Sequence, residues 1–241
     1  MIAIDIKSKK FPAKGRAGQL VAIADFQLAV NCNEFVSLVG PSGCGKTTLL
    51  NIIADLDRNY EGSINFKQHQ THPKIGYVFQ NPRLLPWRTV RENIELAIEE
   101  NSSSENIDAL LEVMQLSQFQ HVYPERLSLG MSRRVAIIRA FAINPDVLLM
   151  DEPFVSLDAA TARQARSLLV SLWQQRPHTV LFVSHDLREA IALADRIVFL
   201  APAPMKIIKE VKVSIPRDDR DNEQAIEAFR QQLLHDYPEL K

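Results

Sequence analysis

A glycine-rich segment between a short apolar run and a helix-forming run constrains the fold of this 241-residue chain more than any other feature. It consists of Gly40, Pro41, Ser42, Gly43, Cys44, Gly45, Lys46 and Thr47. The glycines let backbone N–H groups converge on phosphate oxygens, and the helix that follows adds the partial positive charge of its N-terminus. The segment therefore predicts a nucleotide site in which Lys46 and Thr48 contact phosphate and the Thr47 hydroxyl binds Mg²⁺.

Short apolar runs recur along the chain and alternate with helix-like sequence, which is typical of βαβ units in a parallel sheet. The runs expected to form buried strands are 35–39, 75–79, 147–150, 179–183 and 197–200. Residues 2–6 and 21–30 are expected to form strands joined by a loop over 7–18, as an N-terminal antiparallel β subdomain. We expect helices over 93–100, 104–116 and 131–142, a strand-like segment over 207–215 and a helix over 222–235.

These elements predict an α/β fold, a P-loop NTPase with a mostly parallel core sheet. Residues 81–143 contain no strong strand and are expected to form a helical subdomain inserted into that core. We expect the nucleotide-binding domain to cover residues 1–215, with 216–241 as a short C-terminal extension.

A pair of adjacent carboxylates follows the apolar run 147–150, where ligands of open α/β sheets bind. Asp151 is expected to hold the Mg²⁺ shell through water, and Glu152 to act as a general base on the water that attacks the γ-phosphate. A solvated acidic turn is the alternative for an isolated Asp-Glu pair. The P-loop in the same chain favours the catalytic interpretation.

The composition limits the compartment and the class of partner. The 28 basic and 29 acidic residues give a formal net charge of −1, which argues against a nucleic-acid coat protein. No apolar run approaches the roughly 18 residues that span a bilayer, and residues 1–7 alternate apolar and charged residues unlike a signal peptide. Cys32 and Cys44 form no disulfide or metal pattern, which favours a reducing, cytosolic setting.

Taken together, the residues resemble the ATP-binding subunits of ABC transporters over almost the whole chain. The resemblance implies that Gln80, after the run 75–79, touches Mg²⁺ or the attacking water and senses a membrane partner. It implies that His185 contacts the γ-phosphate and that Asp158, in a Ser-Leu-Asp segment, contacts a second subunit. An aromatic residue upstream stacks on adenine in this family, and Phe11, in the predicted 7–18 loop, is the candidate; packing beneath a mobile loop is the alternative.

The segment Ser128, Leu129 and Gly130 resembles the family signature, which faces the ATP bound by the opposite subunit. A glycine is usual at the position of Leu129, and leucine adds bulk and disfavours positive φ. Two consequences stay open, a weakened site or a leucine that points away without effect. Because Lys46 and the two carboxylates are intact, we favour a working ATPase with altered rate or dimer affinity. Asn33, where a glycine is usual, is a second departure.

Residues 81–93 resemble the importer branch that takes up nitrate, sulfonates, taurine or related small anions. Trp87 in this segment is the candidate anchor for a permease, and a structural tryptophan in a loop is the alternative. The Arg-Pro-Gly-Arg turn of that branch is replaced by residues 203–206, Ala-Pro-Met-Lys. The resemblance leaves the substrate open, because selectivity lies in the permease and the solute-binding protein.

The resemblance implies an ATPase that uses ATP and Mg²⁺ and sits peripherally on the cytoplasmic face of the inner membrane. Its expected partners are transmembrane permease subunits, a second copy or second ATPase subunit, and indirectly a solute-binding protein, without nucleic acid. One alternative is a soluble ABC ATPase of DNA repair or ribosomes, which usually has coiled-coil insertions or two ATPase domains. Another is a regulatory subunit of low turnover, suggested only by Leu129.

Overall fold

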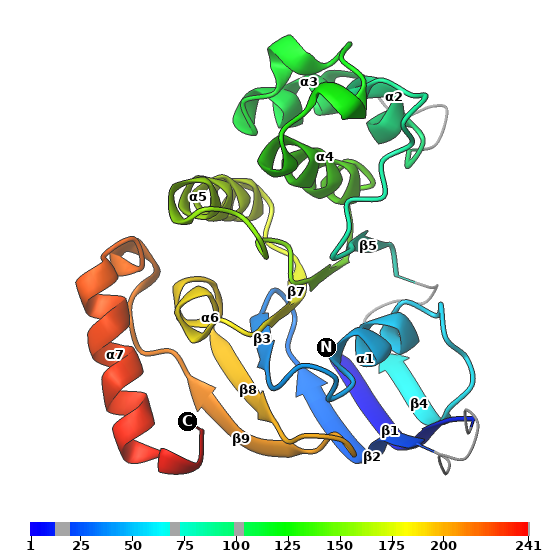
Figure 1. Cartoon of the computed structure of the whole chain (residues 1–241). Helices are drawn as coiled ribbons and strands as arrows, with labels where there is room; N and C mark the ends of the chain where they lie inside the picture. Colours follow the sequence, from blue (N-terminus) through cyan, green and yellow to red (C-terminus); the bar gives the residue numbers. More distant parts are fainter. Residues whose placement is uncertain (13–19, 68–72, 99–103, 241) are drawn as a thin grey trace. The chain divides into compact units, whose positions relative to one another are not determined.

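The computed structural model describes residues 1–12, 20–67, 73–98 and 104–240, and it contains two compact units. The first unit comprises Met1–His72 and Thr179–Lys241, and the second comprises Pro73–His178. The colours of Figure 1 separate them, with blue to cyan and yellow to red in the first unit and green in the second. Each unit is described by itself.

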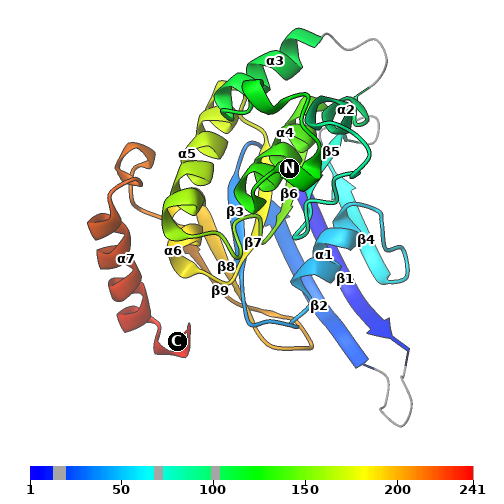
Figure 2. The same ribbon diagram turned by 45° about the horizontal axis from the view of Figure 1, so that its top comes forward.

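An antiparallel sheet opens the first unit. It consists of β1 (Ile2–Phe11), β2 (Leu20–Val30) and β4 (Glu61–Phe66), in the order β2-β1-β4. Alternate residues of β1, namely Ile2, Ile4 and Ile6, are buried, as expected for a sheet with one covered face. Figures 1 and 2 both show α1 (Lys46–Ile53) beside this sheet.

The loop predicted over residues 7–18 is wrong in its first part, because β1 continues to Phe11 and pairs with β2 as far as Leu20. The apolar alternation stops at Lys7, but Lys9 is still a buried position. Its ammonium forms an ion pair with Asp57 and donates to Asn59 O at 2.9 Å, which satisfies the buried charge. Residues 13–18 of the predicted loop lie outside the described residues.

A second sheet of the first unit carries the strands expected to be buried. β3 (Phe35–Val39) lies between β7 (Thr179–Ser184) and β8 (Arg196–Leu200) and is parallel to both, and β9 (Ile207–Lys212) is antiparallel to β8. Figure 1 shows α6 (Leu187–Leu193) between these strands and α7 (Glu223–Asp236). Short 3₁₀ turns, Arg217–Asp219 and Pro238–Leu240, flank α7.

The second unit pairs β5 (Ile75–Val78) with β6 (Val147–Asp151) in parallel. Its helices are α2 (Val90–Glu95), α3 (Ser104–Val113), α4 (Leu129–Ala142) and α5 (Ala159–Gln175), with 3₁₀ turns at Ser117–Phe119 and Pro124–Arg126. The described residues of 81–143 contain helices and turns and no strand, and all belong to this unit.

Side-chain caps explain where two of these helices begin. α2 begins earlier than predicted because Thr89 and Glu92 form a capping box. α4 begins at Leu129 because the Ser128 hydroxyl accepts a hydrogen bond from Met131 N. The cap ties the signature segment to the start of a helix.

Candidate nucleotide site

The glycine loop leaves β3 and enters α1 with two glycines in the left-handed region, Gly43 at φ 79° and Gly45 at φ 110°. A side chain at Gly45 would be strained by this backbone conformation. No side chain caps α1, and its first turn contains no acidic residue. The helix N-terminus therefore presents its partial positive charge without a competing carboxylate, as a phosphate site requires.

The Lys46 side chain is buried against the backbone of this loop. It is 6% exposed, and Nζ donates to Gly40 O at 2.7 Å and to Pro41 O at 2.9 Å. The crest of the loop (Pro41, Ser42 and Gly43) is exposed, as is Thr47, whereas Thr48 is half-buried and Cys44 is buried. A buried ammonium beneath an exposed, glycine-rich crest is suited to neutralising phosphate charge.

At Gly45 the glycine loop lies close to the backbone of β2. A Cβ at Gly45 would lie 3.4 Å from Ala22 O, and Met205 N donates to the same carbonyl at 2.9 Å. Met205 is fully buried. The turn 203–206, which departs from the importer pattern, therefore helps to seat the phosphate loop on the antiparallel sheet.

Phe11 lies at the end of β1, opposite Leu20, and not in a loop as predicted. Its ring is 36% exposed, and Lys9 Nζ lies 4.8 Å from the ring centroid. Lys9 also pairs with Asp57, in the segment after α1, so the same buried cation contacts both the ring and that segment. The ring is held by a cation–π contact, and whether it stacks on adenine stays a prediction.

His185 leaves the same sheet edge as the glycine loop, because Val39 of β3 is paired with Ser184 of β7. The buried Ser184 hydroxyl accepts a hydrogen bond from Asp186 N at 3.0 Å and donates to Glu189 Oε2 at 2.8 Å. Asp186 then caps α6 through Arg188 N at 2.8 Å. These bonds fix the turn that carries His185, whose side chain is exposed.

Gln80 and Glu152 meet within the second unit. They follow neighbouring parallel strands, since Val78 of β5 is paired with Met150 of β6, and Gln80 Nε2 donates to Glu152 Oε2 at 3.4 Å. Asp151 is the buried last residue of β6. One amide and two carboxylates thus follow or end two neighbouring strands of this unit, and their catalytic roles stay a prediction.

Arg133 is a site residue that the sequence analysis missed. It lies on α4, its side chain is 5% exposed, and Nη1 donates to the carbonyls of Gln80, Glu152 and Pro153 at 3.2, 3.3 and 2.9 Å. One guanidinium nitrogen therefore joins the signature helix to both loops that carry the predicted catalytic side chains. The two adjacent arginines after the signature segment were the sequence feature that could have indicated this role.

The structure shows why leucine is tolerated at position 129 of the signature segment while position 130 remains glycine. Leu129 is the first residue of α4, in the right-handed helical region, so the predicted conflict with positive φ does not arise. Its side chain is 45% exposed. A Cβ at Gly130, by contrast, would lie 2.6 Å from Thr161 Cγ2, so a side chain there would force Thr161 to move. The retained glycine is the one that packs closely against α5.

Asp158 caps α5 in the neighbourhood of this glycine. Its carboxylate accepts hydrogen bonds from Thr161 N at 3.0 Å and Thr161 Oγ1 at 2.6 Å. These bonds hold the pKa of Asp158 below its usual value. The geometry gives Asp158 a structural role within its own chain, and its contact with a second subunit stays a prediction.

Trp87 is 69% exposed in the turn before α2. The buried Asn93 side chain accepts from Leu85 N at 2.7 Å and donates to Leu85 O, Arg88 O and Thr89 O at 2.9–3.1 Å. Asn93, a second residue that the sequence analysis missed, thus holds the turn from inside. A rigid turn that exposes an indole is suited to anchoring a partner.

Comparison with known proteins decides the family, because the ABC transporter family model matches residues 23–155, more than half of the chain. The chain belongs to the ABC transporter family. The aliphatic sulfonates import ATP-binding protein SsuB of Bacillus cereus (strain ATCC 10987 / NRS 248) is 39% identical, with 98% of this chain and 95% of SsuB covered. The nitrate import ATP-binding protein NrtD of Synechococcus elongatus is 40% identical, covering 92% and 84%.

Solved structures agree with this assignment. A dimeric structure of the bacterial ABC transporter cassette MJ0796 has a TM-score of 0.77 and 32% identity, and covers 90% of this chain and 100% of the cassette. A post-hydrolysis state of the same cassette with ADP and phosphate has a TM-score of 0.77 and 31% identity. The predicted α/β P-loop fold, the ABC family and the ATPase activity are confirmed.

Family membership makes the departures at Asn33 and Leu129 interpretable. Asn33 has φ 55°, a left-handed conformation that asparagine tolerates better than most residues, so it replaces the usual glycine without a change of backbone. Leu129 likewise keeps a helical backbone. Both departures thus preserve the local fold of the ABC cassette.

Leu129→Gly is expected to raise the ATP turnover or the ATP-dependent dimerisation of this ABC subunit by about two- to fivefold, since it removes an exposed apolar side chain from the signature. Glycine at this first helical position costs only about 1 kcal/mol of helix stability. Steady-state phosphate release and size-exclusion chromatography with ATP measure the two effects. Leu96→Gly, at another exposed leucine of the same unit, is the control for a general loss of packing. Equal behaviour of Leu129→Gly and wild type would show that the departure is neutral.

Proposed function

We propose that this chain is the ATP-hydrolysing, energy-coupling subunit of an importer for a small anion such as nitrate, a sulfonate or taurine. The observation that carries the proposal is its similarity, over nearly its whole length, to both a sulfonate and a nitrate import ATP-binding protein. The segment with Trp87, which resembles this importer branch, is exposed and rigidly held, which supports a docking role.

In this proposal the glycine loop holds the phosphates of ATP through its amides, with Gly40 to Thr48 as the binding segment and Phe11 against the adenine. Glu152 accepts the proton of the attacking water, and Gln80, bonded to its carboxylate, orients that water. Lys46 offsets negative charge on the γ-phosphate as it leaves, and His185 contacts that phosphate.

Oxygen donors of the kind that Mg²⁺ prefers are available for the proposed ion. Thr47 offers a hydroxyl, Gln80 an amide oxygen and Asp151 a carboxylate that acts through water. Thr47 is exposed in the first turn of α1, and Asp151 ends β6. When bound, the ion offsets the negative charge of the phosphates.

The proposed assembly contains two ATPase subunits, either two copies or a pair with a second subunit, and two permease subunits. Ser128, Leu129 and Gly130 face the ATP of the opposite subunit, Asp158 contacts that subunit, and Trp87 contacts the permease. None of the helices in the described ranges is long and apolar enough to cross a membrane. We place the protein peripherally on the cytoplasmic face of the inner membrane, with a solute-binding protein as an indirect partner and no nucleic acid.

Within this proposal the nucleotide-binding domain covers residues 1–215, with its helical subdomain at about 81–143. The C-terminal extension covers residues 216–241. The extension forms its own 3₁₀ turn and helix, which supports its treatment as a separate segment.

Affinity capture from detergent-solubilised native membranes tests the proposal. A multi-span permease is expected in stoichiometric amount, and the accompanying binding protein is screened with nitrate, taurine and alkanesulfonates. Trp87→Ala should reduce permease recovery about tenfold or more, as expected for loss of an aromatic anchor. Leu56→Ala, at an exposed leucine in the first unit, should not.

Two results would contradict the proposal. Recovery only from the soluble fraction with ribosomes or nucleic acid would favour the soluble ABC ATPase. Undetectable turnover by the wild type, alone and with its permease, would favour the low-turnover regulatory subunit.

A further inference from the structure

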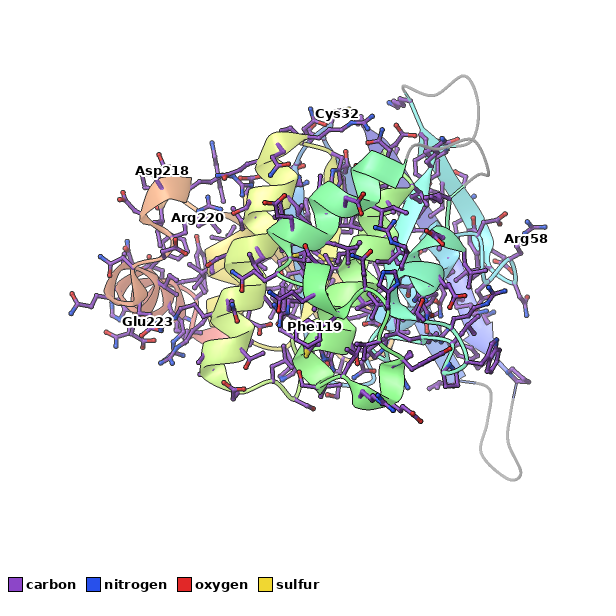
Figure 3. All side chains as sticks on the ribbon, turned by 90° about the horizontal axis from the view of Figure 1, so that it is seen from above. Cys32, Arg58, Phe119, Asp218, Arg220 and Glu223 are labelled. Carbon is purple, nitrogen blue, oxygen red and sulfur yellow. The ribbon has the colours of Figure 1, made fainter. Side chains whose placement is uncertain are left out.

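The C-terminal extension contacts α6 near both of its ends. At the C-terminal end of α6, Arg220 Nη1 donates to Ala194 O at 2.8 Å, and Arg217 Nη1 donates to Leu193 O at 3.4 Å. Arg217 Nη2 also pairs with Asp195 at 2.7 Å. Carbonyls at a helix C-terminus lack partners within the helix and carry partial negative charge, so two guanidinium groups stabilise this end. Figure 3 shows Arg220 at the turn that leads to α7.

At the other end, Arg188 in the first turn of α6 reaches α7. Arg188 Nε and Nη2 lie 2.9 and 2.8 Å from Glu227 Oε2. Arg230 donates to the same carboxylate from within α7, at 2.9 Å from Oε1. The Arg230 hydrogen bonds, followed by those of Gln231 and Arg188, hold the pKa of Glu227 at about 2, so the carboxylate is charged throughout the neutral range.

The position of α6 determines that of His185. His185 immediately precedes Asp186, the cap of α6, and the turn is closed by bonds of Ser184 to Asp186 N and Glu189. Beyond the other end of α6, the Asp195 carboxylate accepts a hydrogen bond from Phe35 N at 3.0 Å, and the Asp195 backbone N donates to Phe35 O at 2.7 Å. Phe35 begins β3, the strand that leads to the glycine loop. The residue that follows α6 is therefore hydrogen-bonded to the start of that strand.

We propose that the C-terminal extension is a positioning element for ATP hydrolysis, which holds α6 at both ends and so fixes His185 relative to the glycine loop. Glu227 and Arg188 are the positioning residues at the end nearest His185. The proposal rests on the proposed role of His185 at the γ-phosphate. The extension therefore acts on turnover and leaves the phosphate-binding loop itself unchanged.

Glu227→Gln and Arg188→Gln test the contact, because each removes one charge and keeps a side chain of similar reach. Each is expected to lower kcat about three- to tenfold with the KM for ATP within about twofold of wild type, since only contacts of the transition state are displaced. Hydrogen exchange of the amides of residues 185–193 should become faster in both variants. Asp236→Asn is the matched control, since it also removes one charge, from an exposed carboxylate at the C-terminal end of α7; its kcat should stay within about twofold of wild type.

His185→Ala, measured in parallel, separates the two proposals. A loss of turnover in His185→Ala with wild-type kcat and unchanged exchange in Glu227→Gln and Arg188→Gln would overturn the positioning role alone. Full turnover in His185→Ala would overturn the proposed role of His185, and with it the positioning of that residue. A rise in KM equal to the fall in kcat, or an equal effect of Asp236→Asn, would also overturn the inference.

Discussion

Glu152→Gln is expected to reduce ATP hydrolysis by about two to four orders of magnitude, the usual contribution of a general base. Glutamine keeps the length of the side chain and an oxygen that can accept the Gln80 amide at the position of the present 3.4 Å contact. It cannot take a proton from water at neutral pH. The chemical step is therefore lost while the architecture of the loop is retained.

The backbone supports this choice of substitution. Glu152 has φ 46°, in the left-handed region, and glutamine replaces one side chain with another that carries the same Cβ, so no new strain is added. ATP affinity should stay within about twofold of wild type, because the lost interaction is made in the transition state. Single-turnover phosphate release measures the chemical step, and equilibrium binding of a fluorescent ATP analogue measures affinity.

Glu112→Gln is the matched control, because Glu112 is an exposed carboxylate on α3 of the same unit. Its turnover should equal that of wild type. A second readout is dimerisation, since ATP that is bound and not hydrolysed should make the Glu152→Gln dimer accumulate in size-exclusion chromatography with ATP. Retention of more than about a tenth of wild-type turnover would exclude Glu152 as the general base.

The sites at strand ends could be predicted because they obey a rule that is visible in sequence. The glycine loop, Gln80, the Asp151–Glu152 pair and His185 each follow an apolar run, and parallel strands deliver such residues to one edge. Within each unit the structure agrees, since β3 is paired with β7 and β5 with β6 up to the residues that precede these sites. The apolar runs therefore located the glycine loop and the two carboxylates, whereas Gln80 and His185 were identified through the family resemblance.

What the sequence did not reveal depends on partners far along the chain. Lys9 ended the apolar pattern of β1, yet Asp57 pairs with it, so the strand continues. Arg133 and Asn93 bind backbone carbonyls and amides, which every residue carries, so no partner residue type marks their roles. β4 was missed because its residues are half-buried or exposed and form no apolar run.

The conformation of Leu129 is another feature that the sequence alone did not reveal. The expected conflict with backbone conformation depended on a φ angle that only the start of α4 determines. The need for glycine at the next position comes from Thr161, a residue of α5. A signature motif in sequence therefore does not distinguish a glycine that packing requires from one that can be replaced.

Arg133→Met is expected to have the second largest effect, lowering both stability and turnover. The side chain is buried, and Nη1 donates to three carbonyls, one buried and two part-buried, so methionine leaves these acceptors without this donor. A hydrogen bond to a charged group contributes about 1.5–3 kcal/mol, and loss of this shared donor should lower the free energy of unfolding by about 3 kcal/mol. Urea denaturation followed by circular dichroism measures the change.

Turnover should fall further than stability alone requires. The carbonyls of Gln80 and Glu152 lie 3.2 and 3.3 Å from the same nitrogen, so its removal releases the backbone on both sides of the hydrogen bond between their side chains. At a temperature where the variant is folded, we expect kcat to drop about tenfold or more, since catalysis is sensitive to displacements of about 1 Å.

Arg134→Met provides the control on the same helix. Arg134 is partly buried, and its Nη1 donates at 3.0 Å to Met114 O, a carbonyl that lies outside both catalytic loops. Its substitution should cost about 1–2 kcal/mol of unfolding free energy and leave kcat within about twofold of wild type. If both variants lost the same stability and both kept full turnover, Arg133 would be an ordinary buried arginine. If Arg133→Met alone lost turnover while folded, the signature helix would be tied to catalysis through that one side chain.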